Sequence, residues 1–245
     1  MPDDTHLWWD QLPGEKHFLM LPNADHPLGW HDVNGMGEGN GTKIFEEAAL
    51  AFYSSVVGRD VHRKWVDDDR PTMTWQITHK DVGTEEESAY ITVSNFSQAA
   101  NGEPVLPTSV KMWHATTLDD KRRDWRLFDC VHEHGCTEME AQPGAFPDAG
   151  PMPHPCVYQA SAEVQRQSDP KWGVQYVAKM KRPANGGWTA FFLAFEFPGP
   201  KDSEVRLNGA IPNLHFTSEV AIVPTRMPFE SCAPFGGAKC TDQLV

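Results

Sequence analysis

The stretch Lys16-His-Phe-Leu-Met-Leu-Pro-Asn-Ala-Asp-His26 decides how the first part of this 245-residue chain is expected to fold. Its apolar run from Phe18 to Leu21 is continuous, as in a strand that is covered on both faces of a sheet. Pro22 ends the run because proline has no N–H for the sheet ladder. A polar turn then leads to His26, and such a loop can hold an acid–base histidine at a sheet edge. The simpler interpretation is a buried strand followed by a surface histidine.

An amphipathic helix is predicted after this loop, over residues 42–57. Apolar residues recur at helical spacing and predict one core-facing side, made of Phe45, Ala48, Ala49, Phe52 and Val56. Gly58 is a suitable residue to end the helix. Strand, histidine loop and helix follow one another as at the end of an α/β-hydrolase. We therefore expect residues 1–60 to be the C-terminal remnant of an α/β-hydrolase-like domain.

The sequence pattern changes after a charged segment, residues 59–71, that ends in proline. Beyond it, alternation with period two predicts short strands at 72–79, 89–96, 109–116, 157–165, 173–180, 188–197 and 215–223. Seven strands with turn residues between them are typical of an immunoglobulin-like β-sandwich. We expect this all-β sandwich over residues 70–245, with a long loop at 137–155. The helix is expected to pack mainly on residues 16–21 and less on the sandwich.

The most distinctive stretch of the chain is Leu7-Trp-Trp-Asp-Gln-Leu-Pro-Gly-Glu-Lys-His-Phe-Leu-Met-Leu-Pro-Asn-Ala-Asp-His-Pro-Leu28, and shorter distinctive stretches begin at Ser109, Arg123, Gly187 and Phe216. These stretches resemble the PhoPQ-activated pathogenicity-related family, which includes autocrine proliferation repressor-like proteins. The resemblance implies a hydrolase related to prolyl oligopeptidase and dipeptidyl peptidase, followed by a β-rich portion. It also implies that His26 is the histidine of a catalytic triad and that the parent protein is extracellular or periplasmic.

The rest of a catalytic triad is not recognisable in the sequence. No G-x-S-x-G motif occurs, and Ser54 and Ser55 fall within the predicted helix. In α/β-hydrolases the nucleophile and the acid precede the histidine. We therefore expect the chain to be the C-terminal part of a longer protein and to be inactive alone. The substrate of the whole protein would be a peptide or an ester. The alternative is a non-enzymatic secreted signalling or binding protein that binds a protein receptor.

Composition narrows the possible partners. The formal net charge of −13 argues against nucleic acid, because phosphate binding needs clustered Lys and Arg. No apolar run approaches the roughly 20 residues of a transmembrane helix. The chain opens with Met1-Pro-Asp-Asp4, so no signal peptide is expected within it. Residues 35–41 are rich in glycine but fit no nucleotide-binding motif, so no cofactor is expected.

Five cysteines leave several pairings open. Cys232 and Cys240 are predicted to form a disulfide, although Cys156 could pair with either. Cys130-Val-His-Glu-His-Gly-Cys136 could be a disulfide-closed loop, a pair of free thiols or a zinc site.

Two other features have competing interpretations. The acidic runs 67–69 and 85–87 could bind calcium but are typical of solvated surface, so no metal is expected. Trp8 and Trp9 could line a pocket or pack in a core.

Overall fold

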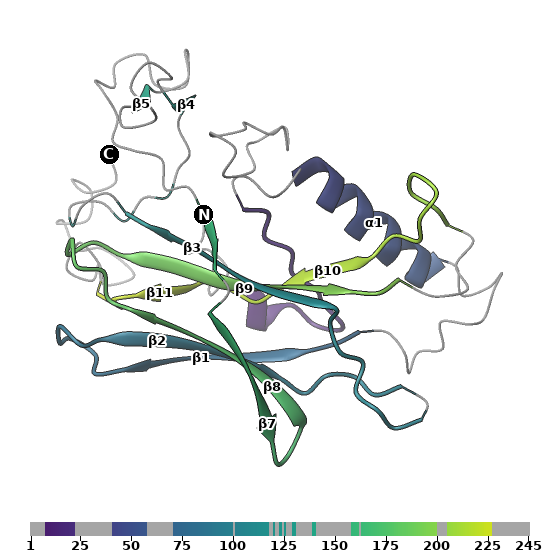
Figure 1. Cartoon of the computed structure of the whole chain (residues 1–245), viewed down its shortest axis with the longest axis horizontal. Helices are drawn as coiled ribbons and strands as arrows, with labels where there is room; N and C mark the ends of the chain where they lie inside the picture. Colours follow the sequence, from purple (N-terminus) through teal and green to yellow (C-terminus); the bar gives the residue numbers. More distant parts are fainter. Residues whose placement is uncertain are drawn as a thin grey trace.

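The computed structural model consists mostly of antiparallel β-sheet with one α-helix (Figure 1). It describes residues 8–22, 41–57, 71–99, 101–117, 120, 123, 125, 129–130, 139–140, 158–161, 163–199 and 205–226. Its helical elements are the 3₁₀ turn η2 (Trp9–Gln11) and the helix α1 (Gly41–Val57). The strands are β1 (Thr74–Lys80), β2 (Ser88–Ser94), β3 (Ser109–Thr116), β4 (Asp129–Cys130), β5 (Met139–Glu140), β6 (Gln159–Ser161), β7 (Val164–Asp169), β8 (Gly173–Lys181), β9 (Thr189–Phe197), β10 (Leu214–Thr217) and β11 (Ala221–Val223).

Two of the sheets have the arrangement of a β-sandwich. The first, which we call sheet 1, has the strand order β1-β2-β8-β7. The second, sheet 2, has the order β10-β9-β3-β6, with β11 also paired to β9. If β10 and β11 are counted as one strand, these orders correspond to A-B-E-D and G-F-C-C′ of immunoglobulin sandwiches. Figure 1 shows sheet 1 below sheet 2.

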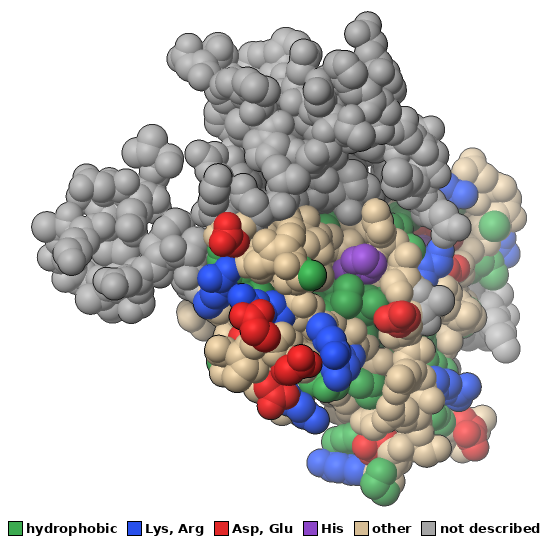
Figure 2. All heavy atoms as spheres, turned by 60° about the vertical axis from the view of Figure 1, so that its left-hand side comes forward, with side chains coloured by type: hydrophobic (Ala, Val, Ile, Leu, Met, Phe, Trp, Pro, Cys, Tyr) green, Lys and Arg blue, Asp and Glu red, His purple; other side chains and the backbone are tan. Residues whose placement is uncertain are grey.

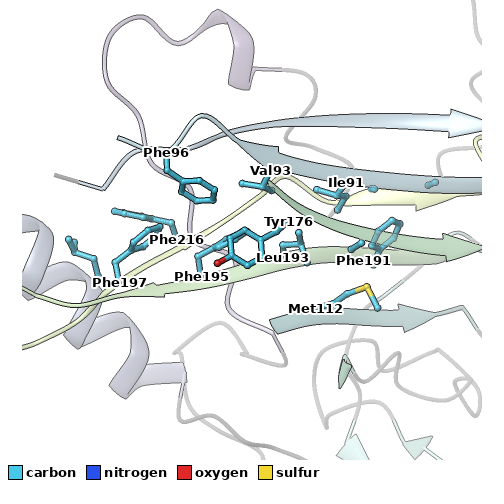
Figure 3. Close-up of a cluster of buried hydrophobic side chains, with 14 of the residues drawn as sticks. Ile91, Val93, Phe96, Met112, Tyr176, Phe191, Leu193, Phe195, Phe197 and Phe216 are labelled. Atoms are coloured by element: carbon cyan, nitrogen blue, oxygen red, sulfur yellow. The ribbon is translucent and has the colours of Figure 1, made fainter. Parts of the chain in front are cut away.

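The main core lies between the two sheets because alternate residues of each strand point inward. From sheet 1, Ile91 and Val93 are completely buried. They point towards Leu193 and Phe195 of β9, as Figure 3 shows. A second cluster involves the opposite side of β9, where Phe192 is buried among aromatic residues. Both sides of β9 are therefore covered, which explains its almost unbroken apolar sequence.

The strand predicted at 215–223 is interrupted. Leu214–Thr217 and Ala221–Val223 pair with different parts of β9. At the break, the Ser218 N–H donates to the Leu193 carbonyl oxygen at 2.9 Å, and the Leu193 N–H donates to Ser218 Oγ at 3.0 Å. Ser218 thus satisfies the backbone of β9 where the ladder is broken, which keeps β10 and β11 on the same side of β9.

Most of the other predicted strands agree with the structure to within a few residues, as β1, β2, β3, β8 and β9. The strand predicted at 157–165 is wrong as a single element. It is divided into β6, which pairs with β3, and β7, which pairs with β8. The chain therefore crosses from one sheet to the other within this segment. The predicted loop at 137–155 contains the short strand β5, and its other residues lie outside the described part of the chain.

Residues 16–21 are extended but do not form the predicted strand, which is a correction to the sequence interpretation. The segment runs beside the end of β10 and is hydrogen-bonded there to one residue, Thr217. The Thr217 N–H donates to the Phe18 carbonyl oxygen at 2.7 Å, and the Met20 N–H donates to Thr217 Oγ1 at 2.9 Å. The ladder does not continue because the next residue, Ser218, is bonded to β9. An α/β-hydrolase remnant is not confirmed by the described residues.

Candidate functional site

Helix α1 is attached to the sandwich through β10 (Figure 1). One carboxylate of the helix makes two polar contacts with this part of the sandwich. Glu47 Oε1 accepts the Asn213 N–H at 3.0 Å, and Glu47 Oε2 lies 3.2 Å from His215 Nε2. On the same side of the helix, Ala51 is completely buried in the main core. The helix is therefore held on the sandwich by small apolar residues and by a half-buried carboxylate.

The opposite side of α1 carries an exposed apolar stripe, which we define as Phe45, Ala49, Phe52 and Tyr53. The side chains of Phe45, Phe52 and Tyr53 are 46%, 39% and 62% exposed. Their spacing places them within about 100° of one another around the helix. Exposed aromatic residues gathered on one helical face are typical of an interaction surface.

The predicted direction of the helix is therefore wrong. Phe45, Ala49 and Phe52 were expected to face the core, but they face outward. Of the predicted side, only Ala48 is buried in the structure, while the side chain of Val56 lies outside the described residues. Glu47 contacts Asn213 and His215, and the buried alanines allow helix and sheet to approach closely. The side of the helix that carries Glu47 is therefore the one that packs.

His17 lies between the helix and the sandwich. Its ring stacks on Phe216 with centroids 4.4 Å apart and meets the edge of Phe52 at 5.5 Å. Its Nε2 atom is 2.8 Å from Glu15 Oε1. This histidine therefore connects the inner edge of the exposed stripe to the core.

Among the described residues, the partners of His17 and His215 do not include a serine. Ser54 lies on α1, as predicted, and its hydroxyl donates to the Leu50 carbonyl oxygen at 2.6 Å. That bond turns the hydroxyl back along its own helix, which is ordinary helix geometry and gives no nucleophile. His26 lies outside the described residues, so its role as a triad histidine stays a prediction. Cys232, Cys240 and the side chains of the Cys130–Cys136 segment also lie outside the described residues. The disulfide between Cys232 and Cys240 therefore stays a prediction, and the alternatives for the Cys130–Cys136 segment stay open.

The acidic run 85–87 separates into two kinds of residue. Glu85 and Glu86 are exposed and form ion pairs, with Arg182 at 2.9 Å and with Lys181 at 3.6 Å. Glu87 is buried and accepts hydrogen bonds from Gly83 and Thr225. Within the described ranges, no group of three or more His, Cys, Asp or Glu residues is placed to hold a metal ion. Residues 67–69 lie outside those ranges.

The tryptophan pair is also divided. Trp9 is buried and packs on Trp75 and Phe18, with ring centroids 5.3 and 5.7 Å apart. Trp8 is 41% exposed. The core interpretation thus applies to Trp9, which packs against β1 through Trp75.

The contact between Glu47 and His215 had no signal in the sequence. The two residues are 168 positions apart, and each alone resembles an ordinary surface residue. The helical period did reveal the apolar stripe, because Phe45, Ala49 and Phe52 follow i, i+4, i+7 spacing.

Comparisons with known proteins give one informative match. No family model and no solved structure matches the chain. A protein of Dictyostelium discoideum named autocrine proliferation repressor protein A is 27% identical over 237 residues. The match covers 96% of this chain but 37% of that protein, so the chain spans little more than a third of the length of this curated relative. The match supports the autocrine-repressor-like part of the resemblance.

In the part of the chain that the structure describes, no helix is both long enough and apolar enough to cross a membrane.

Proposed function

We propose that this chain is the C-terminal part of a secreted autocrine proliferation repressor-like protein related to serine hydrolases. In this proposal residues 1–60, which include helix α1, complete a hydrolase-like domain. The immunoglobulin-like sandwich, residues 70–245, holds α1 so that its stripe faces the rest of that domain. The observation that carries it is the orientation of α1. One side of the helix is bonded to β10, while Phe45, Phe52 and Tyr53 are exposed on the other side. Similarity to the repressor over 96% of the chain supports this assignment.

The chemical part of the proposal concerns His26. This residue follows the segment that is bonded to Thr217 and precedes α1. In this proposal the hydrolase-like domain contacts both the stripe of α1 and His26. There His26 would take the proton from a serine of the longer protein and return it to the leaving group of a peptide or ester substrate.

A second candidate function is non-enzymatic: a secreted signalling or binding protein that uses the same stripe to bind a protein receptor. The observation that favours it is the absence of the predicted strand at 16–21, because that strand would have been part of the hydrolase sheet. The two candidates share the surface on α1 and differ in whether His26 takes part in catalysis.

Activity-based labelling separates the two candidates. The chain alone and the protein expressed together with any upstream coding sequence are treated with a fluorophosphonate probe and with aminoacyl and ester substrates. We expect no labelling of the chain alone, and labelling and turnover of the longer protein. Turnover lost in His26→Ala with retained folding supports the hydrolase. If the longer protein is neither labelled nor active, the hydrolase proposal is wrong and the binding protein remains.

The stripe is tested by the double variant Phe45→Ser, Phe52→Ser. We expect it to abolish binding to the separately expressed upstream part, measured by isothermal titration calorimetry. The matched control is Trp172→Ser on the β7–β8 turn, because Trp172 is 39% exposed, as is Phe52. Equal binding by the double variant and the control would show that α1 is not the contact surface.

A further inference from the structure

The outer face of sheet 1 is polar and open, in contrast to the covered faces of sheet 2. Along β1, exposed and half-buried residues alternate, and the exposed ones are Thr74, Gln76, Thr78 and Lys80. The residues of β2 and β8 that pair with them include Ser88, Tyr90, Thr92, Lys179 and Lys181. Hydroxyl, amide and ammonium groups therefore make up most of this face.

Tyr90 is the centre of a cationic group on this face. In the register of the sheet, Tyr90 lies beside Lys179, and Ser88 lies between Lys80 and Lys181. The Lys80 and Lys179 ammonium groups lie 4.8 and 5.2 Å from the centroid of the Tyr90 ring. Two cations on one aromatic ring repel each other, and an anion bound between them would remove that repulsion.

The hydroxyl groups at this position are held by the same residues. Lys179 is hydrogen-bonded to the Tyr90 hydroxyl, and this bond lowers the pKa of the phenol, with a further bond from Ser88 acting in the same direction. Ser88 is only 3% exposed, and in the register of the sheet it lies between Lys80 and Lys181. The phenol and the two ammonium groups are thus close enough together to act as donors to one ligand.

Carboxylates are scarce on this sheet although the whole chain has a net charge of −13. Among the strand residues of sheet 1, the one Asp or Glu is Asp169, whose carboxylate is already bonded to the Lys171 and Trp172 N–H groups. At the rim, Lys181 is paired with Glu86. Figure 2 shows one side of the molecule, on which Lys and Arg lie beside Asp and Glu. Lys80 and Lys179 instead lie on strands whose other outward residues are uncharged apart from Lys181.

The residues around the lysines indicate which class of molecule bears the anionic group. Gln165, Gln167 and Gln175 form a ladder in which amide groups are joined at 3.0 and 3.1 Å. Planar amides and hydroxyls on an open sheet suit the hydroxyl groups of a sugar chain, because both partners donate and accept hydrogen bonds. A protein partner would need an apolar centre in the interface. The outward strand residues of this face offer for it Val177 and the ring of Tyr90, over which Lys80 and Lys179 already lie. Nucleic acid carries a phosphate at every nucleotide and needs a long row of Lys and Arg, whereas the outward strand residues of this face offer three lysines, Lys80, Lys179 and Lys181.

We propose that the outer face of sheet 1 binds an acidic polysaccharide, with Lys80, Lys179 and the Tyr90 hydroxyl binding one sulfate or carboxylate group of the sugar chain. The glutamine ladder and the threonines of β1 bind the neighbouring sugar hydroxyls. This site does not depend on α1 or on His26, so it holds whether the protein is a hydrolase or a binding protein.

The test is calorimetry of the whole chain with three polymers: neutral dextran, dextran sulfate and polygalacturonate. We expect binding to at least one acidic polymer and none to dextran. If dextran sulfate binds, the group recognised is a sulfate; if polygalacturonate binds, it is a carboxylate. Binding of polyglutamate with equal affinity would overturn the assignment to a polysaccharide, and no binding to either acidic polysaccharide would overturn the site itself.

Single-charge variants locate the site. Lys80→Gln and Lys179→Gln are each expected to weaken binding about tenfold at low salt, because each removes one charge-assisted hydrogen bond. The control is Lys171→Gln, which removes the same charge at the β7–β8 turn. All three side chains are exposed, so the fold is expected to be retained, and circular dichroism checks this. An equal loss in the control would show unspecific attraction and contradict the proposal.

A spectroscopic readout tests contact with Tyr90 directly. The chain has four tyrosines, and their ionisation is followed by ultraviolet absorbance during a pH titration. A bound anion disfavours the phenolate, so the acidic polymer should raise the lowered pKa of Tyr90, and Tyr90→Phe should remove that part of the titration. If the titration of the wild type is the same with and without the polymer while binding is saturated, Tyr90 is not in the site.

Discussion

Glu87 allows the packing of the sandwich to be tested through one carboxylate. It is 1% exposed and lies directly before β2. Glu87 Oε2 accepts the Gly83 N–H at 2.9 Å, while Oε1 accepts the N–H and the hydroxyl of Thr225 at 2.7 and 3.0 Å. It thereby joins the β1–β2 turn to the chain that leaves β11. Replacing it with glutamine keeps the shape of the side chain and removes one acceptor oxygen.

The structure gives the size of the effect. The new amide nitrogen of Glu87→Gln must face either Gly83 or Thr225, and both present N–H groups. At least one buried donor therefore loses its partner, together with a hydrogen bond to a charged group, and such bonds contribute about 1.5–3 kcal/mol. For a protein of this size, this lowers Tm by roughly 3–12 °C. The control is Glu86→Gln, whose exposed partner Lys181 makes a surface ion pair that should contribute little.

The pH dependence provides the second measurement. Burial alone raises the pKa of Glu87. The hydrogen bonds from Gly83 and Thr225 and the nearby His79 together lower it by more than burial raises it, so the pKa in the folded protein is below the usual 4.5. The stabilising contribution is therefore complete above pH 4.5 and is lost as the pH falls through the lowered pKa. Urea unfolding should show a large difference between wild type and Glu87→Gln at pH 7 and a smaller one at pH 3. A constant difference, or a variant as stable as Glu86→Gln, would refute the reasoning.

Three further predictions concern other parts of the fold. Gly199→Ala should destabilise the protein by about 1–3 kcal/mol in urea unfolding, because an added Cβ overlaps the Pro212 carbonyl oxygen; unchanged stability would contradict the packing there. Burial lowers the pKa of His114 below 6.5. Wild-type stability should therefore decrease as the pH falls from 6.5, because the unfolded chain takes up a proton that the folded protein does not bind. His114→Gln should lose less stability than the wild type between pH 7 and 5. A double-mutant cycle of Glu47→Ala and His215→Ala should give a coupling of at least about 0.5 kcal/mol, whereas additive effects would show that this contact does not hold α1 on β10.

The strands that the sequence predicted well are those whose pattern depends on the sandwich alone. Thr74–Lys80 alternates because one side of it faces the core. Thr189–Phe197 is apolar except for Thr189 and Glu196 because both of its sides are covered. Residues 16–21 have a similar apolar run without forming a strand. A run of four apolar residues shows that a segment is extended and sheltered, but a ladder also needs a partner strand with free N–H and C=O groups, and that partner is not visible in the sequence.

The direction of α1 shows the same limit for the candidate site. The helical period placed Phe45, Ala49 and Phe52 on one face, and the structure agrees that they share it. Their burial was assumed because aromatic residues are usually buried, but the side that packs is selected by Glu47 and Ala51 through contacts with distant residues. A helix face that packs in a core and one that binds a partner consist of the same apolar residue types at the same spacing. Periodicity alone therefore could not distinguish the two.

The two proposed surfaces lie on different sides of the sandwich. Helix α1 lies on β10 of sheet 2, while Lys80, Tyr90 and Lys179 are on the outward side of sheet 1, below it in Figure 1. Changes at well-separated sites without shared partners are usually additive. We therefore expect the Phe45→Ser, Phe52→Ser variant to bind the acidic polymer with unchanged affinity, and Lys179→Gln to retain the contact made by α1. If either change affects both measurements by more than about threefold, the two surfaces are coupled, and the core between the sheets would have to transmit that coupling.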